Sequence, residues 1–172
     1  MTWSPQPERA APPVLGDPAS IAALSASMHR VARLIAGAVE AVEPLTGPQR
    51  RQGGELREIT REAARLVAEV ERGAEALSEH GADLADSLGL AHRIVDRAAP
   101  LGLRVDGTVV QPAAGVLGVA DAGAEETREQ HRRRLQRVLD TVLIELDASR
   151  RAVQRRLESG RTDPRASRRT SR

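Results

Sequence analysis

The sequence lacks cysteine, lysine, asparagine, phenylalanine and tyrosine, and Trp3 is its only aromatic residue. Without cysteine there is no disulfide bond, no thiolate metal site and no cysteine nucleophile. Without lysine there is no Schiff-base chemistry and no phosphate-binding loop of the kind that requires a lysine. Strands are rich in aromatic and β-branched residues, so the scarcity of aromatics also disfavours an all-β or α/β fold. These absences exclude most cofactor enzymes and favour a helical protein.

Long apolar runs are also absent. No run approaches the ~20 apolar residues that a membrane-spanning helix requires. The first residues are rich in proline and lack the apolar centre of a Sec signal peptide. The sequence therefore predicts no membrane span, and any export would need another route.

The residues that are abundant, namely Ala, Leu, Glu, Arg and Gln, favour helix. A length of 172 residues suits one domain with tails. We predict an all-α fold, in which a long antiparallel helical hairpin precedes a third long C-terminal helix, as a three-helix bundle or coiled coil with disordered termini. The predicted segments are a disordered Pro-rich arm (1–16), the hairpin (17–99), a linker with a small β-hairpin (100–123), the C-terminal helix (124–159) and a disordered Arg-rich tail (160–172).

The first helix is predicted to begin at Pro18, because Asp17 can cap its free N–H groups and proline is tolerated at the first helical position. Pro44, Gly47 and Pro48 end it. Its apolar residues alternate steps of three and four, which is the spacing of a coiled-coil seam. The residues of this predicted packing seam are Ile21, Leu24, Met28, Val31, Ile35, Ala38 and Val42.

The second helix is predicted to begin near Glu55, and Pro100 ends it. Its predicted seam comprises Leu56, Ile59, Ala63, Leu66, Val70, Gly73, Leu77, Gly81, Leu84, Leu88, Ala91 and Val95. Because this helix would span about 66 Å against about 39 Å for the first, we expect it to overhang or to break near Gly81 or Gly89. Gly73, Gly81 and Gly89 recur every eight residues and either permit close helix approach or weaken the helix.

Beyond the hairpin, Asp106-Gly107 lies between short apolar pairs and predicts a small β-hairpin with these two residues as its turn. Residues 112–123 indicate a linker or a weak helical turn. The third helix is predicted from about Ala124 to Ser159, with acidic residues at its start and arginines near its end, as the helix dipole favours.

No residue pattern of a catalytic or metal site is present. Of the four histidines, His29, His80, His92 and His131, no two have the i, i+4 spacing of a helical metal site. Asp83 and Asp86 are typical of a solvated helix face, whereas His80 lies on or beside the seam of the second helix. We predict that the protein is not an enzyme and binds no metal or cofactor.

Two short motifs lie at the ends of the second helix: Arg51-Gln52-Gly53 in the bend, and His92 to Asp96 at the far end. Here the chain resembles the Trp-x-Gly superfamily of type VII (ESX) secretion proteins, which are antiparallel helical hairpins with Trp-x-Gly in the bend and Tyr-x-x-x-Asp/Glu after the second helix. Arg51 replaces the motif tryptophan and His92 the motif tyrosine, so that Gly53 and Asp96 are the matches. The segments 16–18 and 101–107 are also similar to actinobacterial type VII substrates.

The resemblance implies a bend motif at Arg51 and Gly53 and a secretion motif at His92 and Asp96, the latter read by the secretion apparatus. The alternative is that Gly53 merely permits a tight bend, while His92 and Asp96 form an ordinary i, i+4 pair.

Two Ala-rich helices bury too little apolar surface to offset the entropy of ordering them, so a third or fourth helix is required. We therefore expect a helical protein partner or a homo-oligomer. The first functional hypothesis is a non-enzymatic protein of the type VII class, secreted without a Sec signal peptide as a substrate or as the partner of one.

The alternative hypothesis is a cytoplasmic coiled-coil adaptor. In that case the third helix dimerises and the tail 160–172, which carries five arginines against one aspartate, binds nucleic acid or an anionic surface. The rest of the chain is weakly acidic, so nucleic-acid binding through any other part is not expected.

Overall fold

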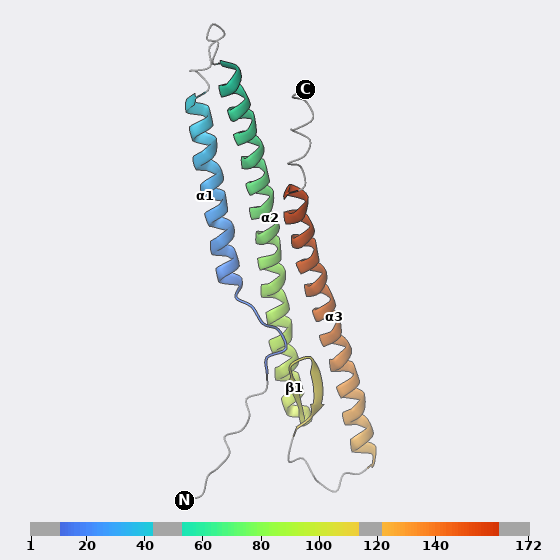
Figure 1. Ribbon diagram of the computed structural model, residues 1–172. Coiled ribbons are helices and arrows are strands. Elements are labelled where there is room, and N and C mark those ends of the chain that lie inside the picture. The colour runs from blue at the N-terminus through green and yellow to red at the C-terminus, as the bar shows by residue number, and fades with distance from the viewer. Residues whose placement is uncertain (1–10, 43–52, 114–121, 162–172) are drawn as a thin grey trace, which may run out of the picture. The chain divides into compact units, whose positions relative to one another are not determined.

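The computed structural model describes residues 11–42, 53–113 and 122–161 (Figure 1). Three long helices dominate, which confirms the all-α class, and a two-stranded antiparallel sheet is the minor component. The elements are α1 (Pro18–Val42), α2 (Gly53–Ala98), the short 3-10 helix η2 (Ala99–Leu101), β1 (Leu103–Asp106), β2 (Val109–Pro112) and α3 (Ala122–Arg161).

The chain divides into two compact units. Unit 1 combines Met1–Gly16 with Leu84–Ala148, and unit 2 combines Asp17–Asp83 with Ser149–Arg172. The division falls within α2 and within α3, so each of these helices contributes one part to each unit. The two units are described separately below.

In unit 2, α1 begins at Pro18 as predicted. The Asp17 carboxylate accepts hydrogen bonds from the Ser20 hydroxyl and from the Ala19 N–H, the latter at 3.0 Å. These donors lower the pKa of Asp17, the Ser20 hydroxyl more than the backbone N–H. The cap satisfies N–H groups that have no partner within the helix.

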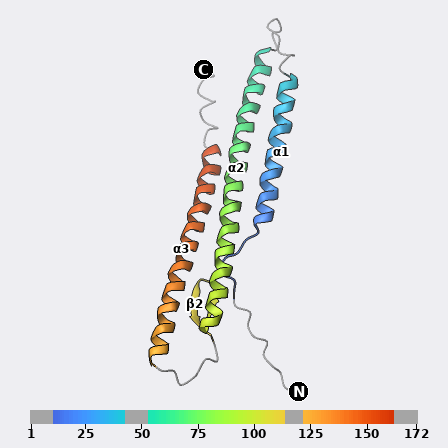
Figure 2. The same ribbon diagram turned by 180° about the vertical axis from the view of Figure 1, so that it is seen from behind.

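Small residues form the contact between α1 and the first part of α2, which run side by side in both views (Figures 1 and 2). The Ser25 hydroxyl donates to the Ala74 carbonyl oxygen at 2.7 Å, and both residues are buried. A Cβ atom added to Gly81 would lie 3.2 Å from Ile21 Cγ2, and one added to Gly73 would lie 3.0 Å from Met28 Cε. Rising numbers on α1 meet falling numbers on α2, so the pair is antiparallel.

The three glycines of α2 therefore differ in role. Gly73 and Gly81 permit close approach, whereas a Cβ atom at Gly89 would meet only Arg93 of its own helix, at 3.6 Å. The predicted break near Gly81 or Gly89 is wrong, because α2 is continuous from Gly53 to Ala98. At Gly81 the side chain of Ile21 packs directly against α2, so this glycine makes room for α1 and does not break the helix.

The packed face of α1 is shifted by one residue from the predicted seam. Ser25 and Ala32 are buried, whereas Leu24 and Val31, one position earlier, are 52% and 46% exposed. The prediction placed the large apolar residues in the helix contact. The close approach of α1 to α2 instead buries the small residues Ser25 and Ala32. Of the other seam residues, Leu84 is buried, Ile21, Met28, Ile35, Leu56, Val70, Leu77 and Leu88 are half-buried, and Ile59 and Leu66 are exposed.

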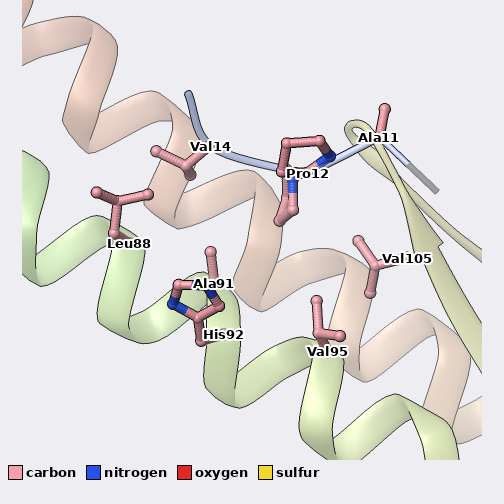
Figure 3. A pocket seen from close by; sticks show the side chains of 9 residues that line it. Ala11, Pro12, Val14, Leu88, Ala91, His92, Val95 and Val105 are labelled. Atoms are coloured by element: carbon pink, nitrogen blue, oxygen red, sulfur yellow. The ribbon is translucent and has the colours of Figure 1, made fainter. Parts of the chain in front are cut away.

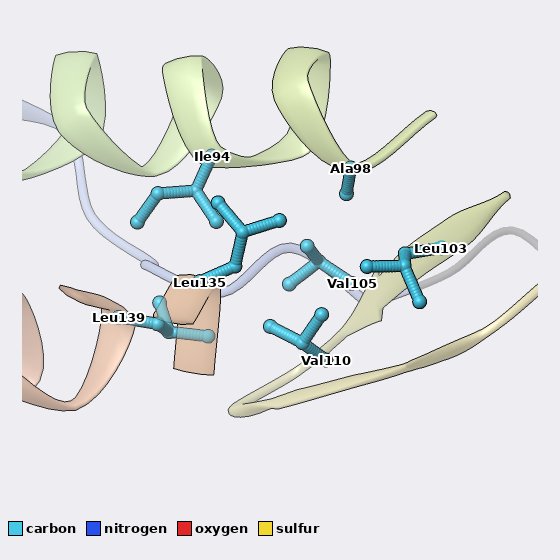
Figure 4. Close-up of a cluster of buried hydrophobic side chains, with 7 residues drawn as sticks. All are labelled: Ile94, Ala98, Leu103, Val105, Val110, Leu135 and Leu139. Atoms are coloured by element: carbon cyan, nitrogen blue, oxygen red, sulfur yellow. The ribbon is translucent and has the colours of Figure 1, made fainter. Parts of the chain in front are cut away.

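Unit 1 contains the principal apolar core, in which α2, α3 and the β-hairpin each contribute side chains (Figure 4). Leu139 of α3 and Val110 of β2 are its largest completely buried side chains. The remaining members are Ile94, Ala98, Leu103, Val105 and Leu135.

The small β-hairpin is confirmed, but its turn differs from the prediction by one residue. Asp106 pairs with Val109, so the turn residues are Gly107 and Thr108 rather than Asp106 and Gly107. Gly107 has φ +56°, a value that glycine adopts without a steric cost. Asp106, which pairs with Val109 and lies outside the turn, accepts a hydrogen bond from the Ala11 N–H.

Residues 11–16 belong to the predicted disordered arm, yet they are packed in unit 1. The Ala11 N–H donates to Asp106 Oδ1 at 3.1 Å, and its carbonyl oxygen accepts from the Gly107 N–H at 2.8 Å. Val14 is buried, and Gly16 has φ +147° beside Leu84. We call residues 11–16 the strap. The prolines indicated an extended segment correctly, but extension did not prevent packing.

Candidate functional site

The far end of α2 carries the two residues of the predicted secretion motif. His92 and Asp96 are both exposed, and within the described parts of the chain no hydrogen bond or ion pair joins them. The expectation of an ordinary i, i+4 pair is therefore not met. Both side chains are accessible to a partner.

The bend motif is only partly visible. Gly53 is the first residue of α2, and Arg51 lies outside the described residues. The prediction that Arg51 and Gly53 form a bend motif stays a prediction.

An apolar cleft with a volume of about 220 Å³ lies beside His92 in unit 1 (Figure 3). The strap forms one wall, the end of α2 another, and Val105 of β1 closes a third side. The lining residues are Ala11, Pro12, Pro13, Val14, Leu88, Ala91, His92, Val95 and Val105. His92 is the only one with a polar side chain, so the cleft suits an apolar group with at most one hydrogen-bonding atom.

The sequence did not predict this cleft, because the strap was assigned to a disordered arm. The available signal was the apolar content of Pro12, Pro13 and Val14, immediately before the helix cap at Asp17. Such a segment can pack without regular structure when a neighbouring strand supplies hydrogen-bond partners, as Asp106 and Gly107 do.

A serine, a histidine and an aspartate meet in unit 2. The Ser149 hydroxyl of α3 donates to Asp83 Oδ2 at 2.6 Å, and His80 Nδ1 lies 2.9 Å from the Ser149 hydroxyl oxygen. Since the hydroxyl hydrogen points to Asp83, His80 is the donor to Ser149. In a nucleophilic triad the histidine instead lies between the acid and the serine and accepts the serine proton.

This cluster ties α2 to α3, together with an ion pair between Arg156 and Glu79. Ser149 lies within α3, where the backbone N–H groups are used by the helix and none is free to stabilise an oxyanion. The sequence placed His80 beside the seam and Asp83 on a solvated face, but it gave no sign that Ser149 joins them.

The start of α3 carries a group of charged residues in unit 1. Glu129 accepts hydrogen bonds from Arg132 Nε at 2.6 Å and from Arg133 Nε at 2.8 Å. These arginines, Arg132 foremost, lower the pKa of the Glu129 carboxyl to about 2. Arg132, Arg133, Gln136 and Arg137 line a cleft of about 480 Å³.

Gln136 in this cleft holds the β-hairpin on α3. Its Oε1 accepts from the Val110 N–H at 2.7 Å, and its Nε2 donates to the Thr108 carbonyl oxygen at 2.9 Å. The polar groups here thus serve the packing of unit 1.

Three observations bear on the other predicted functions. Among residues 11–42, 53–113 and 122–161 there is no group of three or more His, Cys, Asp or Glu that could hold a metal ion. No helix in the same ranges is long and apolar enough to cross a membrane. The tail from residue 162 onward, on which the adaptor hypothesis depends, lies outside the described residues.

Comparison of the chain with protein-family models, with curated proteins and with solved structures finds no match.

Proposed function

We propose that this protein is a non-enzymatic helical protein of the type VII secretion class, exported as a substrate or as the partner of one, and that it acts by packing against helices of another protein. The resemblance at Gly53 and Asp96 motivates the class. The distribution of apolar residues in unit 2 supports the mode of action.

Unit 2 leaves large apolar residues exposed at seven-residue intervals, and this observation carries the proposal. On α1 these residues are Leu24 and Val31, and on α2 they are Ile59 and Leu66, which are 64% and 49% exposed. A seven-residue apolar repeat is typical of a helix that packs against another helix.

The repeat on α2 continues to a position that is covered. Seven residues after Leu66 comes Gly73, where an added Cβ atom would meet Met28 of α1 and Leu157 of α3. Residues at this spacing share one face of a helix. The face that α3 covers at Gly73 is therefore exposed at Leu66 and Ile59, where a partner helix can extend the same packing.

Charges of both signs lie along this face. Glu55, Glu62 and Glu69 are exposed, recur every seven residues and each lie four positions before a residue of the apolar repeat. Glu62 pairs with Arg65 at 3.4 Å. Arg65 and Arg72 are exposed directly before Leu66 and Gly73, so a partner helix would meet both acidic and basic side chains beside the seam.

Export is the direct test of the class. In an actinobacterial host, we expect the protein in the culture medium of a strain with the type VII secretion ATPase and not of a strain without it. Retention in both strains, with the protein intact and helical inside the cells, would contradict the proposal.

The role of the α2 end is tested by Asp96→Arg, which reverses the charge of an exposed side chain. We expect this variant to lose export while its helical circular dichroism stays unchanged. Asp86→Arg is the matched control, since Asp86 is exposed on the same helix and in the same unit. Normal export of the Asp96 variant would refute the role of this residue.

The role of the exposed repeat is tested by the double variant Ile59→Glu, Leu66→Glu. Surface substitutions of this kind change stability by about 0.5 kcal/mol or less, so we expect normal urea unfolding and loss of export. Leu34→Glu is the control, because Leu34 is 74% exposed on α1 outside the repeat. Equal export of all three proteins would exclude helix packing at this face.

A further inference from the structure

We propose that Trp3 of the N-terminal segment docks in the apolar cleft beside His92, so that the chain fills its own cleft with its single aromatic side chain. This inference does not rest on the proposed function, because export is tested through Asp96, Ile59 and Leu66, whereas docking is tested through the emission of Trp3.

The size of the cleft favours one large side chain. Pockets for drug-sized ligands measure about 300–1,000 Å³, whereas this cleft measures about 220 Å³. For comparison, an apolar cavity of about 150 Å³ in another protein holds benzene. The two fused rings of an indole form a larger aromatic group than benzene, and the chain has one indole and no phenylalanine or tyrosine ring.

The chemistry of the lining also suits an indole. Proline, valine, leucine and alanine side chains surround the cleft (Figure 3). The polar edge of a buried tryptophan, its N–H group, needs one hydrogen-bond acceptor. The His92 ring is the only polar side chain of the lining, and no hydrogen bond to it occurs in the described residues. A neutral imidazole nitrogen can accept from the indole N–H.

The course of the chain brings Trp3 within reach. The described chain starts at Ala11, which itself lines the cleft and is anchored by two hydrogen bonds to the β-hairpin. Trp3 is eight residues upstream, so its Cα atom lies at most about 28 Å from that of Ala11.

Fluorescence provides the test, since the absence of a second tryptophan and of tyrosine makes all protein emission that of Trp3. We expect the full chain to emit at shorter wavelength than N-acetyltryptophanamide and to be quenched by acrylamide severalfold less efficiently. Emission and quenching equal to those of N-acetyltryptophanamide would overturn the proposal.

A pair of variants locates the contact. Val95→Asp places a charge in the cleft wall, and we expect it to return the emission and the quenching to the values of the free chromophore. Val109→Asp is the control, because Val109 is 49% exposed on the hairpin but does not line the cleft. Equal effects of the two variants would contradict docking at this site.

A second measurement does not depend on any substitution. In the unmodified protein we expect nuclear Overhauser contacts between the Trp3 indole protons and the methyl groups of Val95 and Val105. The contacts and the emission should be independent of protein concentration. Their absence, or their loss on dilution, would exclude docking within one chain.

Discussion

At the scale of the residue, the group formed by Glu129, Arg132 and Arg133 predicts an acid-dependent loss of stability. The pKa of Glu129 is lowered from 4.5 to about 2. A carboxyl with a lowered pKa contributes stability above its unfolded value, and this contribution is lost as the pH falls through the folded value. We therefore expect the contribution to be complete above pH 4.5 and to disappear towards pH 2.

The measurement is the urea midpoint of the protein and of Glu129→Gln at pH 7, 4.5 and 2. The midpoints should differ at pH 7 and converge at pH 2, by a small amount because the ion pairs are on the surface. Glu126 is in the same helical turn but has no partner among the described residues. The urea midpoint of Glu126→Gln should therefore equal that of the unsubstituted protein at all three pH values. A difference that persists at pH 2 would assign the effect to helix propensity.

Leu139 predicts where the apolar core is most sensitive. This side chain is completely buried, and Leu→Ala substitutions at such sites lower the free energy of unfolding by about 2–5 kcal/mol. We expect a loss in this range for Leu139→Ala in urea unfolding. Ile144→Ala on the same helix removes a side chain that is 68% exposed and should change little. Comparable losses would mean that the two residues are equally buried in solution.

At the scale of the element, two glycines of α2 make opposite predictions for the same substitution. Alanine in place of an unconstrained helical glycine stabilises a protein by about 0.5–1 kcal/mol. Gly89→Ala should give this gain, since its nearest neighbour is the flexible end of Arg93. Gly81→Ala should give less or a loss, because Ile21 must move. Equal gains in the free energy of unfolding would show that α1 and α2 do not approach closely at Gly81.

The helices illustrate what the sequence could predict. Caps and prolines located the start of α1 at Pro18, and periodicity identified three long helices, because these are local properties. The packed face of α1 was missed by one residue, since Ser25 and Ala32 are buried by close approach to a neighbouring helix. That approach depends on glycines in α2 about 50 residues away, which no local pattern connects to α1.

The candidate site was less predictable than the fold. The exposure of His92 and Asp96 follows from their place on the polar side of α2. The cleft beside them requires the strap, whose packing depends on Asp106 nearly 100 residues later. The contact of Ser149 with His80 and Asp83 was equally unpredictable. Helical periodicity indicates the face on which a residue lies, but it does not indicate which residue of another helix lies next to it.

At the scale of the whole molecule, the two units differ in what they bury. Among the described residues, every buried leucine, isoleucine and valine belongs to unit 1, whereas unit 2 buries small residues, which are Ser25, Ala32, Gly73, Ala74, Ala76 and Gly81. Large apolar side chains contribute about 1.5–3 kcal/mol each when fully buried. Unit 2 therefore has the weaker core.

This difference predicts the order of opening in native-state amide exchange. The amides of α1 in unit 2 should exchange through an opening of lower free energy than those of residues 135–146 of α3 in unit 1. A partner that binds the face of Leu66 and Ile59 should raise protection in unit 2 selectively. Uniform protection of the free protein would show that the units open together and that small-residue packing suffices.

The boundary between the units lies inside two helices, between Asp83 and Leu84 of α2 and between Ala148 and Ser149 of α3. Neither unit can thus be obtained as one continuous stretch of chain, and a protease that cuts only loops cannot release either one intact. Unit 2 instead consists of two segments that are far apart in the sequence, Asp17–Asp83 and Ser149–Arg172. A peptide covering residues 17–83 and a second covering 149–161 would have to reassemble in trans, through contacts such as those of His80 and Asp83 with Ser149.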